Sequence, residues 1–321
     1  MADHDTPLRA TLAGLRDRLR PTARLELGPD ERLDGRTAVV TGGNRGLGLA
    51  IAEQLAARGA RLILACRSGG PEAAAVLRER TGNPEVEALP VDLADRDSVA
   101  GLISALAERA PSIDRLVLNA ALVPLESRPT AAGFDEMFHV NFLAAVELVE
   151  GLRARGCLRS SVAGRPARVV VVSSEAHRSG EPDMARFGRY EPYGTKAVMA
   201  HYGRNKLYLT AYAWALAAAH DPAELGVFTL CPGAVATDLA REAPKWMQVV
   251  LAPTMRLLFQ PPAVAAEPAV YLACAAGLDG QTQRYFHMHR PRDPAAWVLA
   301  DAHAAEVRAA AQALLDDPAR R

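Results

Sequence analysis

The side chains best suited to proton transfer are two tyrosines, each followed by a lysine. Tyr202 and Lys206 are four residues apart, whereas Tyr193 and Lys196 are three apart. Residues 198–219 have the pattern of a long helix, and positions i and i+4 share one helix face, so Tyr202 and Lys206 can point into one cleft. A free phenol titrates near about 10, and a nearby ammonium lowers that pKa. We therefore expect Tyr202 to act as a general acid or base that Lys206 tunes.

A glycine-rich turn at residues 41–48, TGGNRGLG, is the strongest sign of a bound cofactor. It lies between an apolar run at 36–41 and an amphipathic helical pattern at 47–57. Glycines in such a turn let the backbone approach a pyrophosphate closely, and the following helix N-terminus supplies N–H groups and positive potential. This context predicts dinucleotide binding by Gly42, Asn44, Arg45, Gly46, Leu47 and Gly48.

The residues after the second apolar run, 61–66, bear on cofactor choice. Proteins that bind NAD place an acid there to hold the ribose hydroxyls, but this chain has Arg67 followed by Ser68. Arg67 and Arg45 could form a cationic clamp for a 2′-phosphate, because the planar guanidinium donates to phosphate in pairs. The cofactor is therefore expected to be NADP(H). The alternative is that both arginines are ordinary solvated surface residues.

The elements that must position these groups alternate along the chain. Apolar runs predict buried strands at 36–41, 61–66, 86–91, 115–118, 168–172 and 227–231, and helical patterns fall between them. Strands that are apolar throughout, separated by helices, indicate a parallel sheet covered on both faces. We predict an α/β fold of the Rossmann type, a doubly wound parallel sheet with helices on both faces.

The domain organisation follows from the same pattern. Residues 1–35 form an N-terminal helical extension, because Leu8, Leu12, Leu15 and Leu19 have helical spacing before Pro21. That helix is expected to pack on the main body or on a second subunit, as in a homodimer. Residues 36–290 form a single dinucleotide-binding and catalytic domain, and residues 291–321 a C-terminal helix.

These motifs together resemble the short-chain dehydrogenase/reductase family. The spacing of the glycine turn is TGxxxGxG, and Tyr202 with Lys206 forms YxxxK after the fifth strand. The stretch YGRNKLYL at 202–209, the 27 residues between Ser174 and Tyr202, and the segments 130–135 and 280–286 are similar to retinol-dehydrogenase-like and carbonyl-reductase-like members. The resemblance implies an alcohol dehydrogenase or ketoreductase activity.

The resemblance also implies roles for further catalytic residues. Ser174, rather than its neighbour Ser173, would hold the substrate oxygen at the end of the fifth strand. Asn141 matches a helix asparagine that supports a water relay to the lysine; the alternative is an asparagine that kinks its helix through backbone bonds. His177 occupies the position of a family histidine, and a structural loop histidine is the favoured interpretation.

The remaining cofactor contacts are likewise implied by the resemblance. Asp92 would contact the adenine and Leu93 follows it. Asn119 lies in LNAA at 118–121, where the family has NNAG, so the first asparagine and last glycine are replaced. The stretch from Pro232 through Thr237 resembles the family's PGxxxT turn, which assigns Pro232, Gly233, Val235 and Thr237 to the nicotinamide end.

The substrate is expected to be a bulky hydrophobic ketone, aldehyde or alcohol, such as a polyketide, terpenoid, steroid or retinoid. A run of large apolar side chains between Trp246 and Phe259 predicts a substrate lid over about 238–262. The alternatives are a cofactor-binding sensor or scaffold without turnover, and an epimerase or dehydratase that uses the same site.

Composition excludes several other classes. Lys plus Arg and Asp plus Glu number 37 each and aromatic residues are 5%, which argues against nucleic acid as a partner. The four cysteines form no CxxC pair, so we expect neither a disulfide framework nor a metal site. With no signal peptide and no apolar run of about 20 residues, we expect a cytoplasmic protein without membrane insertion. The Ala and Arg content suggests a high-GC bacterial genome, hence bacterial secondary metabolism.

Overall fold

The computed structural model describes residues 24–235 and 260–320. The expected N-terminal leucine helix, Thr237 and most of the proposed lid lie outside the described residues. Segment 24–35 packs on the body: Leu33 is fully buried, the Ala276 amide donates to Glu31 Oε1 at 2.7 Å, and the Leu25 amide donates to His289 Nδ1 at 3.3 Å.

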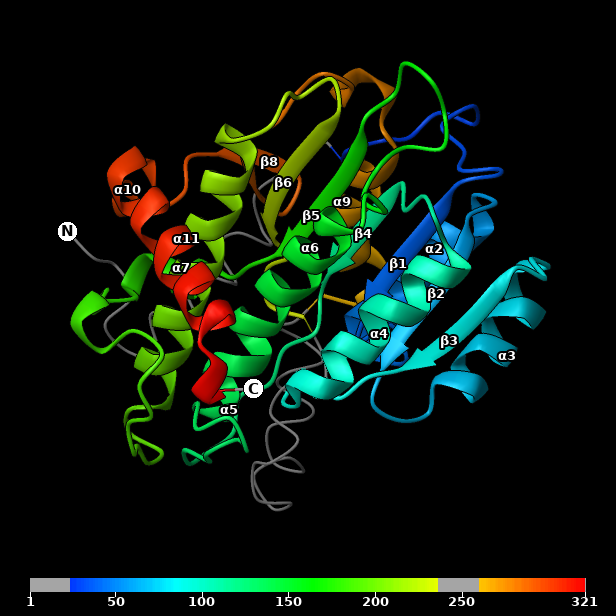
Figure 1. Ribbon diagram of the computed structural model, residues 1–321. Coiled ribbons are helices and arrows are strands. Elements are labelled where there is room, and N and C mark those ends of the chain that lie inside the picture. The colour runs from blue at the N-terminus through cyan, green and yellow to red at the C-terminus, as the bar shows by residue number, and fades with distance from the viewer. Residues whose placement is uncertain (1–23, 236–259, 321) are drawn as a thin grey trace.

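The centre of the fold is one eight-stranded sheet with the order β3-β2-β1-β4-β5-β6-β7-β8 (Figure 1). Among the described strands, pairing is parallel from β3 to β7, and β8 runs antiparallel to β7. The strand order reverses direction at β1 and β4, which is where a doubly wound sheet binds its ligand. The strands are β1 (Thr37–Thr41), β2 (Arg61–Cys66), β3 (Val86–Pro90), β4 (Arg115–Leu118), β5 (Ala167–Val172), β6 (Leu225–Cys231), β7 (Arg284–His287) and β8 (Arg290–Arg292).

Helices cover both faces of the sheet, which confirms the predicted fold class. On one face lie α2 (Gly46–Ala57), α3 (Gly70–Thr81) and α9 (Pro262–Cys274). The other face carries α4 (Arg96–Arg109), α6 (Ala144–Ala154) and α7 (Val198–Ala218). The central strands β1, β4 and β5 are buried along their whole length, as expected for strands covered on both sides.

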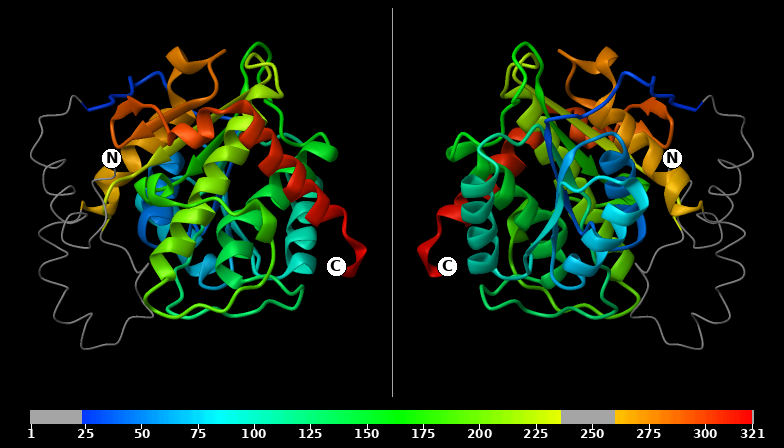
Figure 2. Two further views of the ribbon diagram at one scale, coloured as in Figure 1. Left: turned by 90° about the vertical axis from the view of Figure 1, so that its left-hand side faces the viewer. Right: turned by 90° about the vertical axis from the view of Figure 1, so that its right-hand side faces the viewer.

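The C-terminal region adds a further layer over α7. Helices α10 (Ala296–Leu299) and α11 (Asp301–Asp316) follow β8, and α11 lies along the outer side of α7, as Figure 2 shows in red. Its Val307 and Ala311 are fully buried. The expected C-terminal helix thus occupies 301–316, and the stretch before it contains an edge strand and a short helix.

The helix between β4 and β5 is not uniform. It begins as α5 (Glu136–Phe138), widens into a π-helical turn, η1 (His139–Leu143), and continues as α6. Such π-turns occur frequently at functional sites. Asn141 lies in the middle of this one.

Two fully buried arginines join the end of α9 to the amino ends of β4 and β5. Arg168 on β5 donates to the carbonyls of Leu272 at 2.9 Å and Ala275 at 2.6 Å, and it pairs with Asp279 at 2.6 Å. Arg115 on β4 donates to the carbonyl of Ala273. These carbonyls end α9 without partners in the helix, so the guanidinium groups satisfy them and oppose the helix dipole.

Candidate active site

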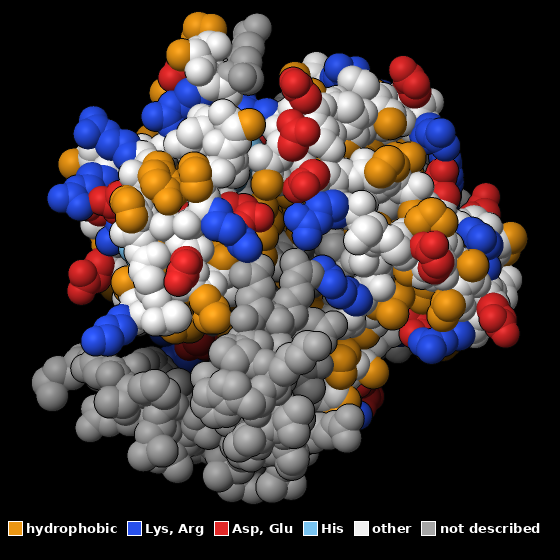
Figure 3. All heavy atoms as spheres, turned by 90° about the horizontal axis from the view of Figure 1, so that it is seen from below, with side chains coloured by type: hydrophobic (Ala, Val, Ile, Leu, Met, Phe, Trp, Pro, Cys, Tyr) orange, Lys and Arg blue, Asp and Glu red, His pale blue; other side chains and the backbone are white. Residues whose placement is uncertain are grey.

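The residues singled out by their chemistry converge on the carboxyl edge of the sheet. The glycine turn follows β1, Arg67 follows β2, Asp92 and Leu93 follow β3, and Asn119 follows β4. Ser174 follows β5, and Pro232, Gly233 and Val235 follow β6. Figure 3 views the molecule from below in Figure 1, the side toward which the parallel strands run. Positive, negative and hydrophobic side chains are interspersed among the atoms coloured there.

Tyr202 and Lys206 lie one turn apart near the start of α7, and both are buried. Lys206 Nζ donates to the carbonyl oxygen of Val172 at 2.9 Å and lies 5.9 Å from the centre of the Tyr202 ring. In the competing pair, Lys196 is exposed. The geometry therefore favours Tyr202 with Lys206 over Tyr193 with Lys196.

The two serines at the end of β5 have different surroundings. Ser173 is buried and its hydroxyl lies 2.7 Å from that of Thr210 on α7. Ser174 is half-buried, and its Oγ accepts a hydrogen bond from the Ala176 amide at 3.2 Å. The Ser174 side chain also lies close enough to the Tyr202 phenol to lower its pKa. Ser174 is thus the serine that shares a site with Tyr202.

Burial shifts both titrating groups toward their neutral forms. Desolvation raises the pKa of Tyr202 to about 12, and the nearby Ser174 side chain acts in the opposite direction. Desolvation also lowers the pKa of Lys206 to about 8. At neutral pH the Tyr202 phenol therefore holds its proton and can donate it.

Both the oxygen and the nitrogen of the Asn141 side-chain amide form hydrogen bonds with the backbone of one residue, Leu122. Its Oδ1 accepts from the Leu122 amide and its Nδ2 donates to the Leu122 carbonyl, both at 2.8 Å. These bonds tie η1 to the segment after β4. One Nδ2 hydrogen and one Oδ1 lone pair of the Asn141 amide are not used by these two bonds.

The glycine turn forms a cradle that only glycine can line. A Cβ on Gly48 would lie 2.2 Å from the carbonyl oxygen of Gly42, and Gly42 has a φ of +65°. Asn119 Nδ2 reaches the same carbonyl at 3.5 Å and that of Thr41 at 2.9 Å. The backbone here is packed as closely as a pyrophosphate-binding turn requires, at the N-terminus of α2. The residues present therefore fit a dinucleotide.

The two arginines proposed to read the cofactor are both exposed. Arg67 Nη1 lies 3.7 Å from Asp92 Oδ2, with the two side chains 56% and 40% exposed. An ion pair that is this exposed and this long contributes little to stability, so Arg67 can leave it for a phosphate. Asn44 Nδ2 donates to the Ser68 carbonyl at 2.8 Å, which draws the glycine turn and the end of β2 together.

A small apolar cluster lies beside Tyr202. Met137, Tyr193 and Val198 are its other buried members, with Leu122 and Val123 packed against them. Tyr193 stacks on His201, with ring centroids 4.3 Å apart. This cluster packs apolar side chains against Tyr202.

Comparison with known proteins agrees with this geometry. A family model described as short chain dehydrogenase matches residues 36–189. Retinol dehydrogenase 13 of Mus musculus is 33% identical over 269 residues, which cover 82% of this chain and 78% of that protein. The chain belongs to the short-chain dehydrogenase family.

Two further relatives define where it stands in that family. Dehydrogenase/reductase SDR family member 13 of Bos taurus is 35% identical over 79% of this chain, which spans 66% of that protein's length. Among solved structures, the Pseudomonas aeruginosa RhlG/NADP active-site complex has 29% identity and a TM-score of 0.62, over 82% of this chain and 98% of that one. The resemblance of the chain to the retinol-dehydrogenase-like members is confirmed.

Sequence reasoning missed one charged residue of this short-chain dehydrogenase, Glu175. Its Oε2 binds Arg178 at 2.9 Å and Arg292 at 2.8 Å, and its Oε1 accepts the Tyr285 hydroxyl at 2.6 Å. Its place directly after Ser174 was the only sequence signal. Glu175 ties η2 (Glu175–Ser179) to β7 and β8.

His177 is a structural residue of this dehydrogenase, as the sequence favoured. Its Nδ1 lies 2.6 Å from the Ser174 carbonyl oxygen, and its Nε2 accepts from the Ala295 amide at 2.9 Å. Burial lowers the pKa of His177 to about 4, so the ring stays neutral and bridges these two backbone groups.

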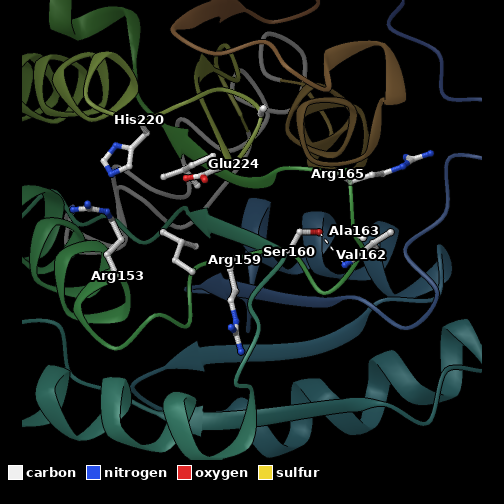
Figure 4. Close-up of a pocket in the computed structure, with 12 residues that line it drawn as sticks. Arg153, Arg159, Ser160, Val162, Ala163, Arg165, His220 and Glu224 are labelled. Carbon is white, nitrogen blue, oxygen red and sulfur yellow. Dashed lines mark hydrogen bonds between the residues drawn. The ribbon is translucent and has the colours of Figure 1, made fainter.

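A pocket of about 490 Å³ lies away from this site (Figure 4). It is lined by the loop 158–165 before β5 and by residues just before β6, so it opens at the amino edge of the sheet. Its arginines diverge in Figure 4 rather than meet at one point, and Arg165 lies 3.6 Å from Asp279. We do not assign this pocket to the oxidoreductase chemistry. Within the described residues, no helix is both long enough and apolar enough to cross a bilayer.

Proposed function

We propose that this enzyme interconverts a ketone or aldehyde and an alcohol on a bulky hydrophobic substrate, using NADP(H), with Tyr202 as the general acid and base. One observation carries the proposal: the hydroxyl of Ser174, the phenol of Tyr202 and the buried ammonium of Lys206 share the carboxyl edge of the sheet, next to the glycine cradle. In this proposal residues 36–290 are the catalytic domain.

The cofactor would be held by the chain's own backbone and polar groups. The amides at the start of α2 would take the pyrophosphate, Asp92 and Leu93 the adenine end, and the turn from Pro232 to Val235 the nicotinamide end. When bound, the nicotinamide supplies or accepts the hydride. Lys206 would hold the ribose next to it.

Proton transfer would fall to the side chains described above. Ser174 Oγ would donate a hydrogen bond to the substrate oxygen and fix it within reach of the Tyr202 hydroxyl. In reduction, Tyr202 gives its proton to that oxygen. In oxidation it takes the proton back, and the Lys206 ammonium favours the phenolate by its positive charge. Because the pKa of Lys206 is about 8, its side chain is mostly charged near pH 7.

The preference for NADP(H) rests on Arg67 and Arg45. Both are exposed at the ends of the segments that would flank the adenosine ribose, and no acid stands at position 67. The solved relative described above was captured with NADP. The substrate class rests on the apolar cluster around Tyr202 and on the name of the relative that acts on retinol.

The test is a substrate screen with the purified protein. NADPH and NADH are offered separately with matched panels of hydrophobic and small polar ketones and aldehydes, and consumption of the cofactor is followed by absorbance. We expect turnover of hydrophobic carbonyls with NADPH and a higher kcat/KM than with NADH. Stoichiometric binding of NADPH without turnover of any carbonyl or alcohol would favour a sensor or scaffold instead.

A further inference from the structure

Three side chains with metal-binding atoms meet beside the catalytic serine. They are Glu175 on η2, Cys231 at the end of β6, and His287 at the end of β7, and one ligand atom of each lies within 4.8 Å of the other two. Cys231 and His287 are register partners in the parallel β6–β7 ladder. No sequence motif predicts this cluster, because its members are far apart in the chain and the sheet brings them together.

We propose that Glu175, Cys231 and His287 bind a divalent transition metal of the zinc class. Thiolate, imidazole and carboxylate are the ligands that Zn²⁺ takes in proteins, and a thiolate in the set selects against Mg²⁺ and Ca²⁺. Three protein ligands leave one tetrahedral position for water or another small ligand. This inference does not depend on the proposed function.

The surroundings of Glu175 hold its carboxylate in the required orientation. Arg178 and Arg292 both donate to Oε2, at 2.9 and 2.8 Å, whereas His287 Nδ1 lies 3.5 Å from Oε1. The arginines thus fix Oε2, and Oε1, which also accepts the Tyr285 hydroxyl at 2.6 Å, lies on the side of Cys231 and His287. Hydrogen bonds of this kind commonly orient the carboxylates that ligate metals.

The same two arginines set a condition on the site. Their positive charges oppose a cation, so the carboxylate alone does not suffice and the Cys231 thiolate must supply a second negative charge. Cys231 is 4% exposed, and the side chains of His287 and Glu175 are 14% and 19% exposed, so the cluster is enclosed without being sealed. We therefore expect Cys231 to be the ligand on which affinity depends most.

A bound ion would link three elements around the catalytic edge. Glu175 follows Ser174 directly, and Cys231 follows Leu230, the register partner of Val172. The Val172 carbonyl is the one that accepts from Lys206. Because the ion binds only the folded arrangement, Zn²⁺ is expected to raise the midpoint of thermal unfolding in a concentration-dependent way.

The test uses Co²⁺ as a spectroscopic probe on the full-length protein after treatment with a chelator. We expect one equivalent to bind, with a thiolate-to-cobalt charge-transfer band in the near ultraviolet that added Zn²⁺ abolishes. Cys231→Ala should remove the band and weaken Zn²⁺ binding by more than about 100-fold, since even the loss of an orienting partner costs 10–100-fold. His287→Gln should also weaken binding. The matched controls Cys157→Ala and His289→Gln should bind as the parent does.

Two results would overturn the proposal. One is a parent protein with no charge-transfer band at saturating Co²⁺, and the other is a band that survives in folded Cys231→Ala. If circular dichroism shows that Cys231→Ala does not fold, X-ray absorption on the zinc-loaded parent decides. One sulfur neighbour supports the site, whereas a shell of nitrogen and oxygen alone contradicts it.

Discussion

Replacing the buried lysine Lys206 with methionine should make the folded protein more stable while abolishing its activity. Burial lowers the pKa of Lys206 from its usual 10.5 to about 8. The difference between 10.5 and about 8, at about 1.4 kcal/mol for each pKa unit, corresponds to a penalty of about 3.5 kcal/mol for holding the ammonium in the fold. Methionine has a similar shape and carries no charge to desolvate.

One lost interaction offsets part of this gain. Lys206 Nζ donates to the Val172 carbonyl at 2.9 Å, and a buried hydrogen bond contributes about 1 kcal/mol. Lys206→Met is therefore expected to raise the free energy of unfolding by about 2.5 kcal/mol near neutral pH. Lys196→Met, at an exposed position, should change it by less than about 0.5 kcal/mol.

The pH dependence separates this explanation from improved packing. The unfolded chain protonates its lysine below 10.5 and the folded chain only below about 8, so the penalty is complete below about 8 and disappears as pH rises to 10.5. The advantage of Lys206→Met should shrink across that window. The assay is urea denaturation of the parent and both variants, without cofactor, from about pH 7 to 10.5. A variant that is less stable than the parent near neutral pH, or an advantage that does not change with pH, would refute the reasoning.

Three further substitutions test the rest of the site. Gly48→Ala should abolish dinucleotide binding, because its Cβ would lie 2.2 Å from the Gly42 carbonyl oxygen; calorimetry with NADPH checks this, and binding at parental affinity would contradict it. Arg67→Ala should raise the Kd for NADPH about tenfold or more and leave that for NADH nearly unchanged, as fluorescence titration would report; equal effects on both cofactors would count against the phosphate clamp. Ser174→Ala should lower kcat by about 100-fold or more, as steady-state kinetics would report. Ser173→Ala loses the contact with Thr210, so it should lose stability rather than turnover, and thermal melts together with the kinetics distinguish the two.

Periodicity was sufficient to predict the sheet and its covering helices. The runs at 61–66 and 115–118 coincide with β2 and β4, and the helix start at Val198 is that of α7, because buried strands and amphipathic helices leave clear patterns. Periodicity did not predict the π-turn at Asn141. That feature depends on a side chain paired with Leu122, a contact between segments that no local pattern records.

The site was predictable where its residues share a local motif. The glycine turn and the pair Tyr202 and Lys206 fall into this class, since spacing alone sets their geometry. Glu175 and His287 escaped notice because their partners come from other strands. Arg67 was predicted as a cation free to bind phosphate, and its exposed pairing with Asp92 appears only once β2 and β3 lie side by side.

The most direct test of the account is turnover by Tyr202→Phe with NADPH and a substrate from the screen, beside Tyr193→Phe. Both substitutions remove one hydroxyl from a buried tyrosine of the same apolar cluster. We predict that Tyr202→Phe loses about 100-fold to 10,000-fold in kcat, the usual contribution of a general acid, and still binds NADPH. Tyr193→Phe should keep most of its turnover. Normal turnover by folded Tyr202→Phe, or a loss confined to Tyr193→Phe, would contradict the assignment of the catalytic proton to Tyr202.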